Sequence, residues 1–336
     1  MNLRSLVVLA PLTILIVAPT LGQVKSASGV AMATEKSKAS NPPRAVDGHP
    51  DIQGVWSFAN LTPLERPAEF AGKAVLTEEE AAAYAKRLRE GRNMDRRDGG
   101  GDADVARAYN DLFWDFGNRA SNQTSLIIDP PDGRLPPLTE LGQKRREARQ
   151  AAQSRPARGP EDRNLGERCI LGFNSGPPML PSAYNNNVQI FETREAVLIM
   201  NEMVHETRVI WLDGRPHSTV RQWMGDSRGH WESNTLVVDT INFRNEGTTF
   251  RIPVDENFHL VERFTRRDAN TLIYEFTVDD PTIETHPWTA SVPMTRSDEP
   301  IYEYACHEGN YGMFGILTGA RAEDKAVEEK AKSKSQ

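Results

Sequence analysis

The stretch from Val188 to Cys306 most constrains the fold of this 336-residue chain. Apolar residues alternate with polar ones in short runs, and turn residues such as Asp213-Gly214 separate the runs. Short alternating runs joined by tight turns are typical of antiparallel β-structure. The pattern predicts a mainly β fold, an antiparallel up-and-down barrel with an irregular and partly helical N-terminal segment wrapped around it.

The N-terminus has the pattern of a secretory signal. A short basic start precedes an apolar run over residues 6–18, and cleavage is expected after Gly22 or Ala33. The run is short for a bilayer span, so we expect no stable membrane span after cleavage; an uncleaved anchor is the alternative. The predicted parts are a signal peptide (1–22), a disordered linker (23–50), a helix and loop segment packed on the barrel (51–165), the barrel (166–320) and a disordered tail (321–336).

The two cysteines, Cys169 and Cys306, stand before and at the end of the β region. In an oxidising compartment they would form a disulfide that restricts the unfolded chain, and two free buried thiols are the alternative. We therefore expect a periplasmic or secreted protein with a Cys169–Cys306 disulfide.

The charged residues are well mixed along the chain, and the formal net charge is −7. A nucleic-acid partner calls for a concentrated basic face, which the sequence lacks, so we expect no nucleic-acid binding. The oligomeric state is left open by the sequence.

Residues 196–212 are predicted to form one long strand that turns back at Asp213-Gly214. In this register Glu206 lies opposite Arg221, and Arg208 shares their solvent-facing side. The other side faces inward and carries both apolar and polar side chains. They are Val197, Ile199, Met203, Val209, Trp211, Val220 and Met224, together with the polar Asn201, His205, Thr207 and Gln222.

Two further hairpins follow from turn residues. A loop at Ser233-Asn234 places Arg228 opposite Asp239. A second hairpin pairs residues 259–265 with 271–278, and its apolar face holds Leu272, Tyr274, Phe276 and Val278. Residues 301–306 are predicted as the closing strand. Helices are expected after the N-caps Thr77, which has a capping box with Glu80, and Thr139.

The inward polar side chains are the main functional signal. A buried polar group without a partner costs about 1–3 kcal/mol, so these groups must bond to one another, bond to water or line a ligand cavity. The predicted ligand-binding residues are Asn201, His205, Trp211, Gln222 and His259. A polar core that satisfies itself is the alternative.

No motif indicates a metal or a covalent mechanism. The chain has neither an HExxH nor a GxSxG motif, and the spacing of its histidines does not support a site built from His205, His259 and His307. We predict no metal and no cofactor. His205 and His259 remain candidates for acid–base catalysis, because an imidazole near a carboxylate in a dry site can move protons.

Five stretches carry a resemblance to a known family: residues 51–56, 124–137, 225–240, 259–281 and 301–313. Over residues 51–320 the chain resembles a family of uncharacterised secreted bacterial proteins that occur in many copies in soil and marine species. The resemblance implies export and a lipocalin-like β-barrel, and it assigns no catalytic residue.

The sequence therefore predicts an exported protein that binds a small apolar or amphipathic molecule in its barrel. One alternative is an acid–base enzyme of the isomerase, dehydratase or hydrolase type that acts on a metabolite in the same barrel. Another is a structural or interaction module of the cell envelope.

Overall fold

The computed structural model describes residues 42–97, 99–106, 111–244, 254 and 256–334. The predicted signal peptide and the linker up to residue 41 lie outside these residues. The helices are α1 (Glu78–Arg92), α2 (Gly100–Ala106), α3 (Glu140–Ser154) and α4 (Tyr311–Lys334), with 3-10 turns η1 (Ala68–Phe70), η2 (Asp111–Phe113), η3 (Pro160–Asp162) and η4 (Met203–His205). The strands are β1 (Gly54–Ser57), β2 (Ile127–Asp129), β3 (Asn187–Glu192), β4 (Ala196–Asn201), β5 (Thr207–Trp211), β6 (Asp226–Glu232), β7 (Thr235–Ile241), β8 (His259–Arg266), β9 (Thr271–Asp279) and β10 (Trp288–Ser297).

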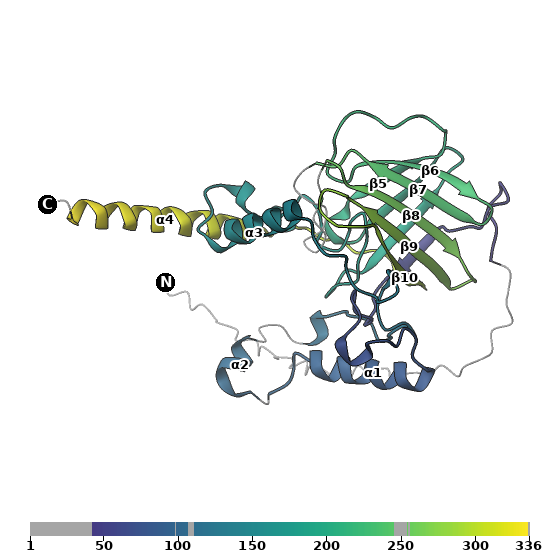
Figure 1. Cartoon of the computed structure of the whole chain (residues 1–336), viewed down its shortest axis with the longest axis horizontal. Coiled ribbons are helices and arrows are strands. Elements are labelled where there is room, and N and C mark those ends of the chain that lie inside the picture. Colours follow the sequence, from purple (N-terminus) through teal and green to yellow (C-terminus); the bar gives the residue numbers. More distant parts are fainter. Residues whose placement is uncertain (1–41, 98, 107–110, 245–253, 255, 335–336) are drawn as a thin grey trace, which may run out of the picture. The chain divides into compact units, whose positions relative to one another are not determined.

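The strands form a closed barrel, as the sequence predicts. Strands β3 to β10 follow one another around the ring, and β1 closes it by pairing with both β3 and β10 (Figure 1). Strand β2 pairs with β10 beside β1. The neighbours are antiparallel except for β5 and β6, which run parallel. Because β1 belongs to the barrel, the barrel extends beyond the predicted range 166–320.

The barrel interior is packed with large apolar side chains. Along β9 every second side chain points inward, and the predicted apolar face of Leu272, Tyr274, Phe276 and Val278 is at most 1% exposed. Trp56 of β1 is fully buried among them, and burial of a large apolar side chain contributes about 1.5–3 kcal/mol. These aromatic and aliphatic side chains make the centre of the barrel a packed hydrophobic core.

A buried ion pair crosses the interior. The guanidinium of Arg208 donates to both carboxylate oxygens of Glu262 at 2.5 and 2.9 Å, and both side chains are at most 5% exposed. The hydroxyl of Tyr274 donates to Glu262 Oε1 at 2.8 Å and accepts from the backbone N–H of Met179 at 3.2 Å. The prediction that Arg208 faces solvent is therefore wrong.

The error arises because residues 196–212 do not form one strand. The turn η4 separates β4 from β5, and the two strands pair antiparallel around it. The turn changes which side faces inward, so that Arg208 and Ile210 are buried while Val209 and Trp211 point outward. No glycine marks this turn, so the alternating pattern hid it.

The predicted hairpin at Asp213-Gly214 is also wrong. After β5 the chain crosses over through residues 212–225 and returns as β6 parallel to β5, with Trp211 opposite Arg228. Parallel neighbours need such a long connection. The predicted pairing of Glu206 with Arg221 does not occur, because Arg221 lies in the crossover segment, where it forms an ion pair with Glu256.

The other two hairpins form as predicted. Strands β6 and β7 place Arg228 opposite Asp239, and β8 pairs with β9 from His259 to Arg266. Strand β10 is the last strand in the sequence, and the predicted strand at 301–306 does not form. β10 accommodates Pro293, because this residue lies between the stretches paired with β2 and with β1, where that edge of the strand has no partner.

The predicted helix starts are confirmed. Thr77 and Glu80 form a capping box at α1, and the Thr139 hydroxyl accepts from the N–H of Gly142 at α3. The predicted disordered tail is wrong up to residue 334, because α4 continues to Lys334, with Ala320 as its buried residue. Its alanine, glutamate and lysine residues favour a helix even without burial.

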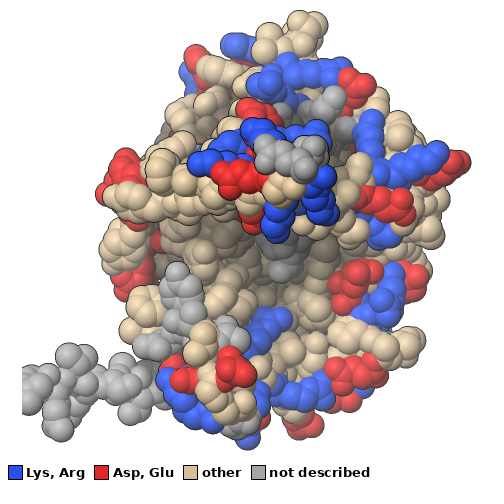
Figure 2. Space-filling model, turned by 90° about the vertical axis from the view of Figure 1, so that its left-hand side faces the viewer, with Lys and Arg blue, Asp and Glu red and all other residues tan. Residues whose placement is uncertain are grey.

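Charges of both signs are interspersed over the face shown in Figure 2. Within the described part of the chain, no helix is both long enough and apolar enough to cross a membrane.

Candidate ligand pocket

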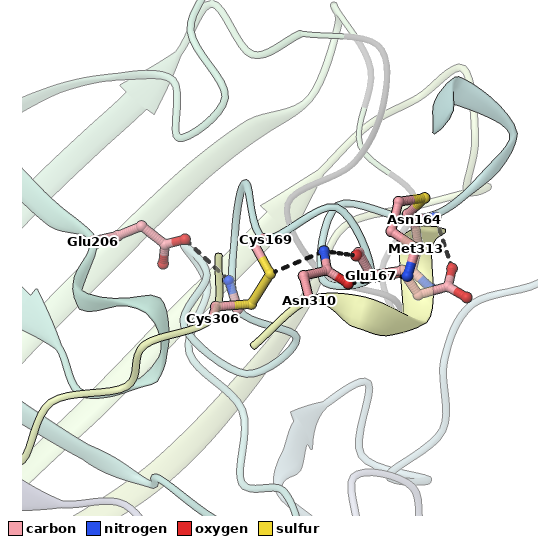
Figure 3. Close-up of a disulfide and its surroundings, with 8 residues drawn as sticks. Asn164, Glu167, Cys169, Glu206, Cys306, Asn310 and Met313 are labelled. Atoms are coloured by element: carbon pink, nitrogen blue, oxygen red, sulfur yellow. Dashed lines mark hydrogen bonds between the residues drawn. A yellow bond between two sulfur atoms is a disulfide. The ribbon is translucent and has the colours of Figure 1, made fainter. Parts of the chain in front are cut away.

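The predicted disulfide is present. Cys169 lies in the loop between α3 and β3, and Cys306 lies just before α4, 137 residues further along the chain. The side-chain amide of Asn310 donates to the carbonyl of Glu167 at 2.9 Å and to Sγ of Cys169 at 3.3 Å (Figure 3). The bond and this amide hold the start of α4 against the loop.

A cavity of about 400 Å³ lies beside the disulfide. Three segments far apart in the sequence meet around it, and we call it the disulfide pocket. The α3–β3 loop contributes Asn164, Gly166, Glu167, Gly172, Phe173 and Tyr184, η4 contributes Met203 and Val204, and the segment before α4 contributes Tyr304 and Cys306.

The walls of the disulfide pocket are mainly apolar and aromatic. Phe173 meets the ring of Tyr184 edge-on at 5.5 Å between centroids. Gly172 is required by close packing, because a Cβ atom there would lie 2.6 Å from Cγ of Met203. The cavity volume and lining are in the range of sites for small organic molecules.

The turn η4 forms one wall in a strained conformation. Val204 and His205 have φ angles of 63° and 56°, in the left-handed region that β-branched residues rarely adopt. The ring of His205 shares hydrogen bonds with the backbone of the third wall, through Nε2 to the Tyr302 carbonyl at 2.9 Å and through Nδ1 to the Tyr304 N–H at 3.5 Å. Nε2 therefore carries the proton, and His205 positions the pocket wall.

Glu206 lies directly behind the pocket wall. Its carboxyl group accepts from the N–H of Gly172 at 3.0 Å and contacts the hydroxyl of Ser175 at 2.7 Å. Burial raises the pKa of Glu206 from 4.5 to about 7, against the lowering effect of these two hydrogen bonds. The neutral form fits the site as well, because a protonated Glu206 can donate to Ser175 while Ser175 donates to the Gly172 carbonyl.

The raised pKa of Glu206 predicts a pH-dependent stability. The folded protein holds this proton up to about pH 7, whereas the unfolded chain releases it near pH 4.5. The free energy of unfolding therefore falls as the pH rises through this window. In Glu206→Gln the fall between pH 5 and pH 8 should be smaller than in the parent, as measured by urea unfolding. The exposed Glu303→Gln serves as the control, and an unchanged slope in Glu206→Gln would contradict the assignment.

The structure does not bring the five predicted ligand-binding residues together. His205 supports the disulfide pocket from outside, and Gln222 is exposed in the crossover segment. Asn201 points into the barrel, 4% exposed, and its Oδ1 has no hydrogen-bond partner within the described residues. Trp211 faces outward beneath the guanidinium of Arg215, at 4.4 Å.

His259 belongs to a separate cluster on the outer wall. Its Nε2 contacts Asp239 at 2.7 Å, and the other oxygen of Asp239 contacts Nε2 of His217 at 2.9 Å. Nδ1 of His217 contacts Asp226 at 3.0 Å. Both ring nitrogens of His217 thus face carboxylates, which fastens the crossover segment to β6 and β7. The hydrogen bond from His259 lowers the pKa of Asp239.

The cluster around His217 and His259 does not form a metal site. Across the residues that the structure describes, no group of three or more His, Cys, Asp or Glu side chains could hold a metal ion.

Most residues of the disulfide pocket were not predicted from the sequence. Phe173, Tyr184 and Tyr304 stand outside the regular strands, so no alternation marks them. The predicted cysteine pair was the signal that could have located them. It joins the α3–β3 loop to the segment before α4, and both line the pocket.

Comparisons with protein-family models, with curated protein sequences and with solved structures found no match to this chain.

Proposed function

We propose that this protein binds a small, mainly apolar molecule in the disulfide pocket. The observation that carries the proposal is a cavity of about 400 Å³ with aromatic and aliphatic walls. Such walls favour an apolar ligand through burial of its surface, and the neighbouring backbone groups and carboxyl of Glu167 can orient a polar end.

The pocket at the barrel end is a better candidate than the barrel interior. The interior around Trp56 and Tyr274 is filled by fully buried side chains, and the Arg208–Glu262 pair, which contacts Tyr274, is buried there as well. The disulfide pocket has rigid walls in the Cys169–Cys306 bond and the turn η4. A preformed site loses little entropy when a ligand enters.

An acid–base enzyme is the second candidate, and Glu206 is the residue that favours it. A carboxyl group with a pKa of about 7 can both take and give a proton at neutral pH. The two histidines proposed from the sequence are less suited to this role, because His205 holds backbone groups and neither histidine lines the disulfide pocket.

We also propose that the protein is exported and belongs to the secreted bacterial family that it resembles. The apolar run at residues 6–18 supports a signal peptide. The disulfide supports folding in an oxidising compartment, since such bonds persist there.

One preparation tests both proposals. The full-length chain is produced in a bacterium and recovered from the periplasm, where the mass should show loss of the leader after residue 22 or 33. The purified protein is then titrated with the apolar fluorophore N-phenyl-1-naphthylamine. We expect saturable binding that Tyr304→Ala weakens about tenfold, because it removes an aromatic wall.

Tyr302→Ala is the matched control, because Tyr302 lies two residues away and its side chain is 61% exposed. The proposal requires this variant to bind like the parent. Equal losses in both variants, or no saturable binding by the parent, would leave an envelope structural module as the better interpretation. Protein retained in the cytoplasm with an intact N-terminus would contradict export and leave the binding result to stand separately.

A further inference from the structure

A second, smaller cavity lies at the C-terminal end of helix α1, and it shares no lining residue with the disulfide pocket. It has a volume of about 120 Å³, and its lining includes Arg89, Arg92, Asp111, Asp115 and Phe116. The volume suits a molecule of a few non-hydrogen atoms. The guanidinium of Arg92 lies over the ring of Phe116, at 4.8 Å from the centroid.

Two arginines of α1 provide an internal comparison. Arg87 lies over the ring of Tyr84 at 5.0 Å, and its charge is paired with Glu69 at 2.6 Å. Arg92 lies over Phe116 in the same way, but no hydrogen bond or ion pair joins it to another described residue. Burial lowers the pKa of Arg92, because the charged guanidinium has lost water and no carboxylate among the described residues pairs with it.

The other charges of the cavity are already engaged. Arg89 donates to the carbonyl of Asn118 at 3.3 Å. Oδ1 of Asp111 accepts from the N–H of Met94 at 3.3 Å, and Oδ1 of Asp115 accepts from the N–H of Gly117 at 3.3 Å. The two carboxylates would repel a doubly charged anion, whereas a single negative charge can pair with Arg92.

We propose that Arg92 binds the carboxylate group of a small organic acid in this cavity. The N–H groups of a guanidinium lie in its plane, so stacking on an aromatic ring leaves them free to donate. Two of these N–H groups match the two oxygens of a carboxylate. Leu61 and Trp114, which also line the cavity, offer apolar surface to the organic part of the acid.

The site lies on an aromatic row that reaches the disulfide pocket. Phe116 stacks on Trp114 at 5.4 Å, Trp114 meets Tyr184 at 6.3 Å, and Tyr184 lines the disulfide pocket. The carboxylate site and the disulfide pocket have no lining residue in common, so a test of one does not decide the other.

Acetate is the probe for this site. The ¹⁵N-labelled protein is titrated with sodium acetate at constant ionic strength, with chloride as the balancing anion, and the arginine Nε–Hε resonances are followed. The Arg92 resonance, identified by its loss in Arg92→Lys, should shift saturably with acetate. In Arg92→Gln the saturable shifts of neighbouring backbone resonances should be lost, and Arg92→Lys should bind about tenfold more weakly because it cannot form the paired bonds.

Arg87→Gln is the matched control and should bind acetate like the parent. Thermal unfolding of each variant verifies folding, and Arg92→Lys decides the question if Arg92→Gln does not fold. Equal weakening by Arg87→Gln, or an Arg92 shift that grows linearly and equally with chloride, would overturn the proposal. Tighter binding of inorganic phosphate than of acetate would overturn the assignment to carboxylates.

Discussion

Replacement of Arg208 by methionine is expected to destabilise the protein by about 3–5 kcal/mol. The change leaves the carboxylate of Glu262 buried with no cation, in a position that is 0% exposed. The single hydrogen bond from Tyr274 cannot compensate for the loss of both bonds to Arg208. Urea unfolding of the parent and of Arg208→Met, followed by far-UV circular dichroism, measures the difference.

The double variant Arg208→Met/Glu262→Gln tests the reason for this loss. The neutral amide removes the unpaired charge and still accepts the hydroxyl of Tyr274 through its carbonyl oxygen. The double variant should therefore recover much of the stability that Arg208→Met loses, because removal of a whole buried pair is often nearly neutral. A loss below about 1 kcal/mol in Arg208→Met, or a double variant less stable than the single one, would contradict the buried-charge account.

Removal of the disulfide has the second large expected effect. In Cys169→Ser/Cys306→Ser the unfolded chain regains the freedom of a segment in which the cysteines stand 137 residues apart. The chain-entropy relation gives a loss of about 3–5 kcal/mol. The fluorophore affinity of the disulfide pocket should fall as well, because Cys306 forms part of its wall.

Dithiothreitol supplies the control for this experiment. The reductant should lower the urea midpoint of the parent to that of the double variant and leave the double variant unchanged. Equal midpoints for the oxidised parent and the variant would show that the bond restricts the unfolded chain very little. Unchanged fluorophore affinity would show that the pocket wall is held by the Asn310 hydrogen bonds instead.

The barrel was predictable where local signals and long-range pairing agree. Ser233-Asn234 is a two-residue turn between alternating runs, so the register of β6 and β7 follows from it directly. The inward face of β9 follows from strict alternation in the same way. In these segments the hydrophobic pattern alone determines which side faces the core.

The candidate site was less predictable because it depends on irregular backbone. The turn η4 places Val204 in a left-handed conformation that its side chain disfavours, so only tertiary contacts can specify it. The same turn moved Arg208 to the core and Trp211 to the surface. The helix α4 was missed because its composition is equally typical of a solvated tail.

The crossover at residues 212–225 has a geometric origin in the number of strands around the ring. In the described chain the ring contains nine strands, β1 and β3 to β10. Strand direction can alternate all the way around a closed ring only if the number is even, so an odd ring must contain a parallel seam. The seam here is β5–β6, whose one paired position is Trp211 with Arg228, whereas His217 of the crossover contacts β6 and β7. Local opening of the barrel should therefore start along this line, and hydrogen exchange should be fastest there.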